Sequence, residues 1–310
     1  MSVQEAVRKP PVAKKPQVAI MNAIHDLPVL VARDLGLFKD EGLDIDFVTT
    51  PGMAQVTTSH FVKFDSIFDR PLDSVYNEGG IDQYRMCEWG IMKRAVEADA
   101  QGIRKRKIVA LGAAMSSFAI VVARDSKAYE PEMLKDQVIA VTPNNGSHFT
   151  TLKMMEGFLE QQHVKVTNAG TMPQRLKALK EGKVAAVSLM EPWISVAQKQ
   201  GLRILIESHS TRAEAAGDDL DGATLKKMFR AQARACEVLE KDPTPYLKYL
   251  VAETGGLLEE KDFQAWRLLN APPTPYTRER WDDTYTWTVK WNMTVPGATF
   301  ENTVDNRAWE

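Results

Sequence analysis

PVLVARDLGLFKDEGLDI, residues 28–45, is the stretch of sequence that decides the fold. Its apolar residues recur at helical spacing, which predicts a helix over residues 27–35. Gly42 then allows a tight turn, and residues 43–48 alternate between apolar and polar side chains, as a half-buried strand does. A short apolar run at residues 18–21 precedes the helix. The segment therefore predicts a β-α-β unit at the start of an α/β fold.

The chain continues this alternation of strands and helices. Strand-like and amphipathic runs follow each other at short intervals up to about residue 207, which predicts parallel sheets with helices on both faces. From about residue 221 onward the periodicity is helical. The expected strands are 108–112, 119–123, 137–142, 164–166, 184–189 and 202–206, and the expected helices are 89–101, 147–162, 173–180 and one opening at Glu191.

The bulk properties narrow the class of protein. The 310 residues are 44% hydrophobic and 26% charged, with a formal net charge of −2. This length suits two lobes, and the near-neutral charge gives no electrostatic reason to bind nucleic acid or an anionic membrane. No apolar run is long enough to predict membrane insertion. Because the N-terminus lacks an apolar signal-peptide core, we expect a cytoplasmic protein, or a periplasmic one whose signal peptide has been removed.

The Pro, Ala, Gly-Leu-Phe and Gly-Leu-Asp-Ile residues within 28–45 occur at a spacing that resembles the opening of type 2 periplasmic binding proteins. The resemblance is to their nitrate, sulfonate, taurine and thiamin-pyrimidine substrate-binding group, and it extends from about residue 17 to residue 306. It implies an α/β fold of two lobes with a hinge and a C-terminal helical return. We expect a flexible N-terminal lead-in over residues 1–16, lobe one over 17–123 plus 208–310, and lobe two over 124–207.

In such a fold the ligand lies between the lobes, near the carboxyl ends of strands and the N-termini of helices. The turn after the first strand carries Asn22 and His25. His25 could contact a ligand or act as an acid–base group, because the pKa of histidine is ordinarily near neutrality. It could equally be a residue of the helix entrance, with Asp26 as N-cap and Pro28 in the first turn.

A second turn, TPNNGSH at residues 142–148, joins an expected strand to a helix whose N-terminal amides suit an anion. The same residue types would cap the helix without a ligand. One helix terminus contributes only about 0.3–1 kcal/mol to holding a charge, so lobe closure and apolar burial must supply most of the affinity. The ligand candidates in this turn are Asn144, Asn145, Gly146, Ser147 and His148.

Two further places are expected to face the cleft. Glu191 and Trp193 follow a strand, and Trp193 offers a stacking face, although a helix start with a core tryptophan explains them as well. Ser116 and Ser117 lie between two expected strands. Their hydroxyls could bind a ligand oxygen or simply make the turn.

Residues 51–88 form a long segment of weak periodicity, which in a compact domain is often functional. His60, with Phe61 after it and Arg70 beyond, resembles the spacing in the biphenyl-sulfinate desulfinase of the dibenzothiophene pathway. This resemblance implies His60 as acid–base and Arg70 as bidentate anchor of a sulfinate or carboxylate. The cysteine nucleophile that the desulfinase carries on the first β-α turn is unmatched, since residues 23–25 are Ala, Ile and His.

The cysteines and the short motifs add little. The chain has two cysteines, Cys87 and Cys236. Cys87 could serve as a nucleophile from elsewhere in the fold, or be a small core residue. The sequence contains no phosphate-loop, dinucleotide-binding or zinc-protease motif, so we predict neither a cofactor nor a metal site.

Two functional hypotheses follow. The first is a substrate-binding protein that closes its lobes on a small anionic or heteroaromatic organic molecule (sulfonate-, carboxylate- or pyrimidine-like), with an ABC transporter permease as partner if it is exported. The alternative is a cytosolic, cofactor-free enzyme of the same fold, a desulfinase- or decarboxylase-like lyase or hydrolase that uses His25, His60 and Arg70. The unmatched nucleophile favours the first hypothesis, and the missing signal peptide favours the second.

Overall fold

One mixed sheet organises the molecule. The computed structural model describes residues 15–50 and 66–310, and within them an eight-stranded sheet has the order β2-β1-β3-β8-β4-β7-β5-β6. The strands are β1 (Gln17–Ile20), β2 (Asp46–Thr49), β3 (Gln83–Cys87), β4 (Lys107–Val122), β5 (Val138–Val141), β6 (Lys165–Asn168), β7 (Ala186–Met190) and β8 (Arg203–Ala216). The α-helices are α1 (Ala23–Asp34), α2 (Leu37–Asp40), α3 (Pro71–Asn77), α4 (Glu88–Glu97), α5 (Gly146–Met155), α6 (Met172–Lys180), α7 (Trp193–Lys199), α8 (Gly222–Lys241), α9 (Lys248–Glu253), α10 (Arg278–Lys290) and α11 (Phe300–Thr303).

The predicted β-α-β unit is confirmed at the start of the chain. β1 pairs in parallel with β2, with Gln17 opposite Asp46, and α1 connects the two strands. Gly36 and Gly42 both have a φ of +72°, in the left-handed region that residues with a Cβ rarely adopt. These glycines let the chain leave α1 and turn into β2.

α1 begins earlier than predicted, and the reason is its cap. The side-chain oxygen of Asn22 accepts a hydrogen bond from the His25 N–H at 3.0 Å, so Asn22 is the N-cap. Pro28 therefore lies inside the helix rather than in its first turn. Asp26, the expected cap, instead accepts the N–H groups of Met21 at 2.6 Å and of Asn22 at 2.9 Å.

The middle of the sheet differs from the predicted parallel arrangement. β8 pairs antiparallel with both β3 and β4, and β4 pairs antiparallel with β7, so only the outer strands are parallel. The strands expected at 108–112 and 119–123 are one strand, because a register shift between Leu111 and Met115 lets β4 bend without ending. Ser116 and Ser117 thus lie inside β4 instead of in a turn.

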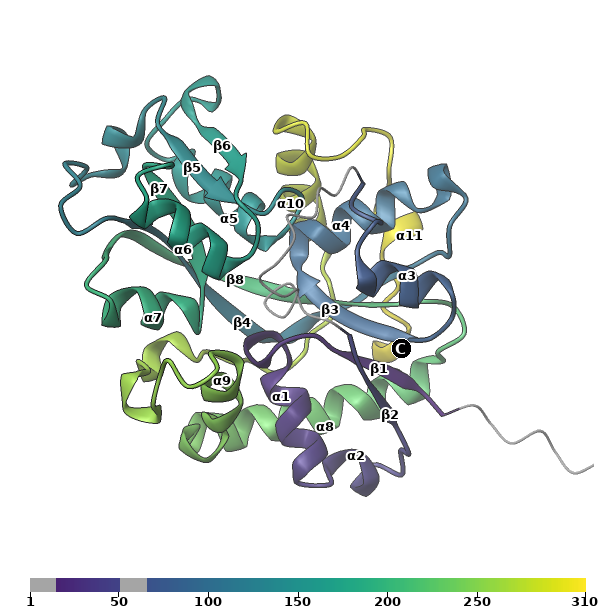
Figure 1. Cartoon of the computed structure of the whole chain (residues 1–310). Coiled ribbons are helices and arrows are strands. Elements are labelled where there is room, and N and C mark those ends of the chain that lie inside the picture. The colour runs from purple at the N-terminus through teal and green to yellow at the C-terminus, as the bar shows by residue number, and fades with distance from the viewer. Residues whose placement is uncertain (1–14, 51–65) are drawn as a thin grey trace, which may run out of the picture.

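Two lobes flank the long strands β4 and β8 (Figure 1). One lobe contains β1, β2 and β3 with α1 to α4, and the other contains β5, β6 and β7 with α5, α6 and α7. α8 packs on α1, and α10 packs on α4, which confirms the C-terminal helical return. The lobe boundaries at 123/124 and 207/208 stay predictions, and the lead-in of residues 1–14 and the segment 51–65, with His60, lie outside the described residues.

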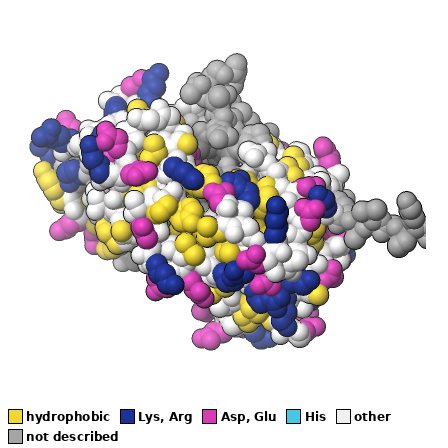
Figure 2. All heavy atoms as spheres, turned by 90° about the horizontal axis from the view of Figure 1, so that it is seen from below, with side chains coloured by type: hydrophobic (Ala, Val, Ile, Leu, Met, Phe, Trp, Pro, Cys, Tyr) yellow, Lys and Arg dark blue, Asp and Glu magenta, His cyan; other side chains and the backbone are white. Residues whose placement is uncertain are grey.

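The surface carries both signs of charge. On the face shown in Figure 2, Lys and Arg side chains are interspersed with Asp and Glu, and small hydrophobic groups lie between them. This face presents no single-signed field of the kind that attracts a polyanion. Within residues 15–50 and 66–310, no helix is both long and apolar enough to cross a membrane.

Candidate functional site

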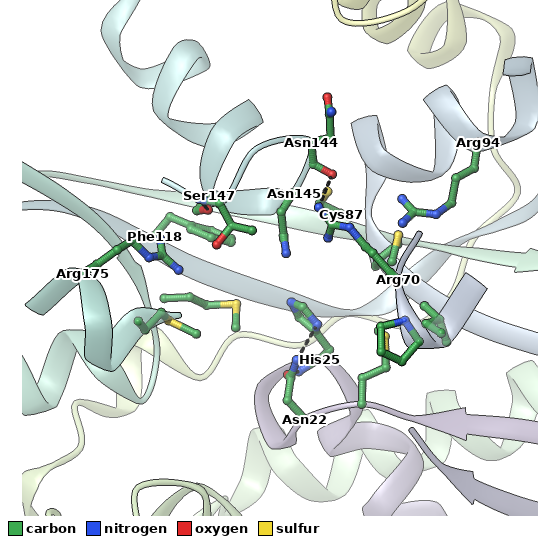
Figure 3. A pocket seen from close by; sticks show the side chains of 17 residues that line it. Asn22, His25, Arg70, Cys87, Arg94, Phe118, Asn144, Asn145, Ser147 and Arg175 are labelled. Atoms are coloured by element: carbon green, nitrogen blue, oxygen red, sulfur yellow. Dashed lines mark hydrogen bonds between the residues drawn. The ribbon is translucent and has the colours of Figure 1, made fainter. Parts of the chain in front are cut away.

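A cavity of about 860 Å³, including space open to solvent, is lined by residues of both lobes (Figure 3). Its walls come from the ends of β1, β3 and β7, from β4, and from the starts of α1, α3, α5 and α6. Among the described residues no Asp or Glu lines it. The lining residues are Met21, Asn22, His25, Arg70, Pro71, Leu72, Met86, Cys87, Arg94, Phe118, Thr142, Asn144, Asn145, Ser147, Met172, Arg175 and Met190.

The backbone N–H groups of the first β-α turn, residues 21–23, donate to the carboxylates of two side chains. Asp26 accepts the first two N–H groups of this turn, and Glu253 Oε2 accepts the third, from Ala23, at 2.8 Å. Asp26 is in turn ion-paired with the buried Arg85. Burial raises the pKa of Glu253 to about 7. All three amides of this turn are therefore occupied, and none is left for an external anion.

His25 reaches the cavity from α1, between Asn22 and Arg212. The Nδ2 of Asn22 lies 3.0 Å from His25 Nδ1, and the Nη1 of Arg212 lies 3.2 Å from His25 Nε2. Burial, followed by the charges of Arg212 and Arg85, holds the pKa of His25 well below its usual 6.5. The imidazole is therefore neutral at pH 7, and it can hydrogen-bond a ligand but is a weak base.

The second β-α turn, residues 142–147, is held by neutral groups. Ser147 Oγ accepts from the Thr142 N–H at 3.0 Å, and the side-chain oxygen of Asn145 accepts from the N–H of Gly146. No carboxylate among the described residues takes part in these contacts. Ser147, in the first turn of α5, lines the cavity, so the partial positive charge of this helix end lies beside it.

Arg175 enters the cavity from α6, on the side opposite Arg70 (Figure 3). Its Nη1 donates to the Ser188 carbonyl, while its Nε has no hydrogen-bond partner in the described part of the chain. The residue is 4% exposed, and burial lowers its pKa to about 9, so it stays charged at pH 7. No carboxylate of the described residues pairs with it. A buried charge without a counterion is costly, and an anionic ligand would supply one.

Arg70, the predicted anion anchor, lines the cavity but also binds the chain itself. Its Nη2 donates to the carbonyls of Pro143 at 2.7 Å and Asn144 at 2.9 Å, which joins the start of α3 to the second turn. Burial and then the charge of Arg94 lower its pKa to about 9. Arg94 differs, because its guanidinium is bound by both carboxylate oxygens of Asp73, at 2.8 and 2.7 Å.

Cys87 forms part of the cavity wall, at the N-cap of α4. Burial raises the pKa of its thiol, although Arg212, the Gly90 N–H, Arg94 and Arg70 act in the opposite direction. The thiol is therefore protonated at neutral pH, which makes it a poor nucleophile. No group of three His, Cys, Asp or Glu side chains suited to a metal occurs in the described residues.

Six of the predicted ligand residues line this cavity, and whether they contact a ligand stays a prediction. They come from the first β-α turn, the start of α3 and the second β-α turn, which supports the expectation that strand and helix ends converge. They are Asn22, His25, Arg70, Asn144, Asn145 and Ser147.

Gly146 and His148 lie just outside the lining. A Cβ on Gly146 would come within 2.9 Å of the Phe118 ring, so the absence of a side chain lets α5 approach β4. His148 Nδ1 accepts the Asn144 N–H at 3.2 Å, and burial lowers its pKa to about 4. Both residues shape the second turn from behind the cavity. His60 lies outside the described residues.

The other predicted residues make structural contacts away from the cavity. Ser117 donates to the Arg267 carbonyl at 3.1 Å from within β4, beside the buried Ser116. Glu191 accepts from a serine hydroxyl one helical turn on and pairs with Arg267 at 3.2 Å. Trp193 is packed in the hydrophobic core. Packing against other elements, which a strand-end rule does not include, decides these positions.

Arg175 and the apolar wall of the cavity were not among the predicted site residues. The wall consists of Phe118 and several methionines, of which Met21, Met86 and Met190 each lie at or next to the end of a strand. The last apolar residue of each strand was therefore a usable signal. No comparable local signal marks Arg175, because its environment depends on contacts between elements.

No family model matches this chain, and no curated protein matches it. Solved structures, by contrast, match the fold of this chain. The periplasmic aliphatic sulphonate binding protein SsuA from Escherichia coli has a TM-score of 0.70 at 16% identity, over 94% of this chain and 92% of that one. The CA3427 gene product of Candida albicans, described as having the periplasmic binding protein fold, has a TM-score of 0.67 at 13% identity, over 95% and 97%.

The desulfurization enzyme DSZB has a TM-score of 0.59 at 13% identity, over 95% of this chain and 98% of that one. These similarities confirm the two-lobed, type 2 periplasmic-binding-protein-like fold. At such identities they concern the fold alone. The site must therefore be interpreted from its own residues.

Proposed function

We propose that this protein binds a small organic anion in the cavity between its lobes, in the manner of a substrate-binding protein. Arg175 is the observation that carries the proposal. Its guanidinium is buried, charged at neutral pH and without a carboxylate partner in the described residues, and it points into the cavity (Figure 3). A bound anion would supply the missing counterion.

The sizes of the contributions fit a ligand with an anionic head and an apolar body. Hydrogen bonds to a charged group contribute about 1.5–3 kcal/mol each, whereas micromolar binding requires about 8 kcal/mol. Burying roughly 150–200 Å² of apolar ligand surface adds about 4–5 kcal/mol. Phe118 and the methionines provide that apolar wall, and methionine adapts well to aromatic or aliphatic groups.

A sulfonate or a carboxylate suits Arg175 best, because the planar guanidinium presents two parallel N–H groups to such a head. The fold shared with a protein named for aliphatic sulphonate binding supports this class. A pyrimidine-like heteroaromatic ligand without an anionic group would leave Arg175 without a counterion, and is therefore the weaker candidate.

Isothermal titration calorimetry tests the proposal with hexanesulfonate, benzenesulfonate, benzoate and an uncharged aminopyrimidine. At least one anion is expected to bind, and Arg175→Met should weaken its binding by about 10- to 100-fold. Lys177→Met is the matched control, because that side chain is on the same helix and 75% exposed. Equal binding to wild type and Arg175→Met, or no binding of any anion, would contradict the proposal.

A cofactor-free enzyme is the second candidate, favoured by the presence of His25, Arg70 and Cys87 in one cavity. The protonated thiol and the neutral imidazole weigh against it. Mass spectrometry of sulfonates, sulfinates and carboxylates incubated with stoichiometric protein separates the two functions. A compound recovered unchanged with the protein indicates binding, and a new product indicates catalysis.

We consider two alternatives for the cellular location of the protein, and each implies a different role for the cavity. If the protein is exported, its partner is the permease of an ABC transporter, and the ligand is released there. If it stays in the cytoplasm, the cavity serves as an intracellular binder or as the enzyme described above. Fractionation of cells producing the protein from its native gene decides between these two locations.

A further inference from the structure

The imidazole of His25 cannot form a hydrogen bond with both of its polar neighbours at once. Both neighbours of the imidazole are N–H donors: the Asn22 amide at 3.0 Å from Nδ1 and the Arg212 guanidinium at 3.2 Å from Nε2. A neutral imidazole has one accepting nitrogen and one N–H. It can therefore accept a hydrogen bond from only one of these donors. At the other contact, two N–H groups face each other without an acceptor.

The N-cap of α1 fixes the orientation of the Asn22 amide. Asn22 must keep its oxygen on the backbone N–H of His25, at 3.0 Å, so its amide nitrogen faces Nδ1 and donates to it. In the tautomer that accepts from Asn22, the imidazole proton is on Nε2, where it meets the Nη1–H of Arg212. An acceptor atom placed beside Nε2 from the cavity would receive the imidazole hydrogen and lie near the charge of Arg212.

Arg212 itself also lacks acceptors. Its Nη2 donates to the Ser210 carbonyl at 3.1 Å, but its Nε has no partner, and no carboxylate pairs with it within the described residues. The residue is completely buried, and burial lowers its pKa to about 10, so it stays charged. His25 and Arg212 thus form a pair that we call the His25–Arg212 pair: His25 lines the cavity, and the charged Arg212 lies buried behind it.

The His25–Arg212 pair and Arg175 approach from different sides. In Figure 3 the side chain of Arg175 comes from α6 and that of His25 from α1, and the cavity lies between them. The cavity lining also includes apolar side chains, among them Phe118, Met172 and Met190. A ligand with a single polar head would satisfy one end and leave the other without an acceptor.

We infer that the ligand is two-headed: an anionic group binds Arg175, and a second, acceptor-only group such as a carbonyl or carboxylate oxygen binds His25, next to the buried charge of Arg212, across an apolar body. This inference rests on the proposed function and names its ligand class. It makes His25 a specificity-determining residue for the second head group. Each end of such a ligand touches a different lobe, so both ends contribute to lobe closure.

The test compares ligands that differ only in the second group. The probes are 4-isopropylbenzenesulfonate, 4-acetylbenzenesulfonate and 4-sulfobenzoate, together with their meta isomers. In all of them the second substituent has the same number of heavy atoms. Calorimetric titration of wild type should give about tenfold tighter binding for the acetyl than for the isopropyl compound, and a larger gain for the carboxylate.

His25→Leu should remove this gain and leave the affinity for the isopropyl compound within about twofold. His25→Gln can donate a hydrogen bond and should restore part of the gain. It also serves as a control for a folding defect in the leucine variant. His163→Leu is the control, because that histidine is distant on the surface, beside Asp136. Arg175→Met should weaken all the compounds alike.

The outcomes separate the two proposals. If neither these sulfonates nor benzoate and hexanesulfonate bind, the proposed function fails and the inference fails with it. If sulfonates bind through Arg175 but the acetyl and isopropyl compounds bind equally in both isomer series, only the two-headed ligand is overturned. A gain that survives in His25→Leu overturns the assignment of the second head to His25.

Discussion

The two β-α turns that face the cavity differ in how their backbone N–H groups are satisfied. In the first turn, Asp26 and Glu253 bring carboxylates to the N-terminus of α1. In the second turn, the side-chain oxygens of Ser147 and Asn145 bond to the backbone, and both are neutral. The backbone N–H groups of the first turn are therefore not available to an anion, whereas no carboxylate opposes an anion at the backbone of the second turn. The same local motif can thus be capped by carboxylates, which exclude an anion from its backbone N–H groups, or by neutral groups, which do not.

Asp26→Ala should have the largest effect, because it removes the support of the first turn. It would leave the buried Arg85 with one partner fewer and two backbone N–H groups without acceptors. We expect the free energy of unfolding in urea to fall by about 3–5 kcal/mol. Asp44→Ala is the control, at an exposed carboxylate. A loss below about 1 kcal/mol would show that the first turn does not depend on its carboxylate.

Glu253 should make the first turn sensitive to pH. Its pKa is raised from 4.5 to about 7 in the folded chain, so between these values the folded state binds a proton more tightly than the unfolded state. Stability should therefore fall as the pH rises through this window, by up to about 3 kcal/mol. Glu253→Gln should flatten the profile, whereas Glu259→Gln, at an exposed carboxylate, should leave it unchanged. The prediction would be contradicted if the stability of wild type rose with pH between about pH 5 and about pH 7 and this rise disappeared in Glu253→Gln.

On the opposite side of the cavity, Arg175→Met should stabilise the protein while it weakens anion binding. The substitution removes a buried charge that lacks a counterion, so we expect the free energy of unfolding to rise by about 1–2 kcal/mol. Thermal and urea unfolding in the absence of ligand would measure it. A marked destabilisation, with binding retained, would mean that Arg175 serves the structure rather than the ligand.

Ser147→Ala should have the smallest effect of the four. The Thr142 N–H loses its acceptor, which should cost about 1 kcal/mol of stability and a few-fold in anion affinity. Ser126→Ala, which removes a similar contact to the Ala128 N–H far from the cavity, should change stability alone. If both variants bind the anion equally well, the second turn orients no ligand.

Much of the fold could be predicted from local spacing. The β-α-β unit followed from the apolar pattern and from Gly42, and the structure contains it as β1, α1 and β2. The long central strands could not be predicted as such, because the interruption near Leu111 is a register shift that only pairing with β8 defines. A pattern of apolar residues specifies a strand, but the direction of its neighbour depends on the rest of the sheet.

The candidate site was predictable where it depends on strand and helix ends. Asn22 and Ser147 follow strands whose ends meet at the cavity, so the sequence could indicate them. Glu191 occupies the same kind of position, yet it pairs with Arg267 in the interior. A position at a strand end shows where a side chain starts, whereas its partner comes from a distant part of the chain.

Arg94 and Arg175 show the boundary between sequence and tertiary structure. Each is an arginine in a short helix, and the sequence by itself determined both helices through local spacing, with a capping box added in α6. Only the tertiary structure brings Asp73 to Arg94 and leaves Arg175 without a carboxylate at the cavity. Ion pairing falls off within a few ångströms, so the charge state of a site depends on which distant segments packing brings together.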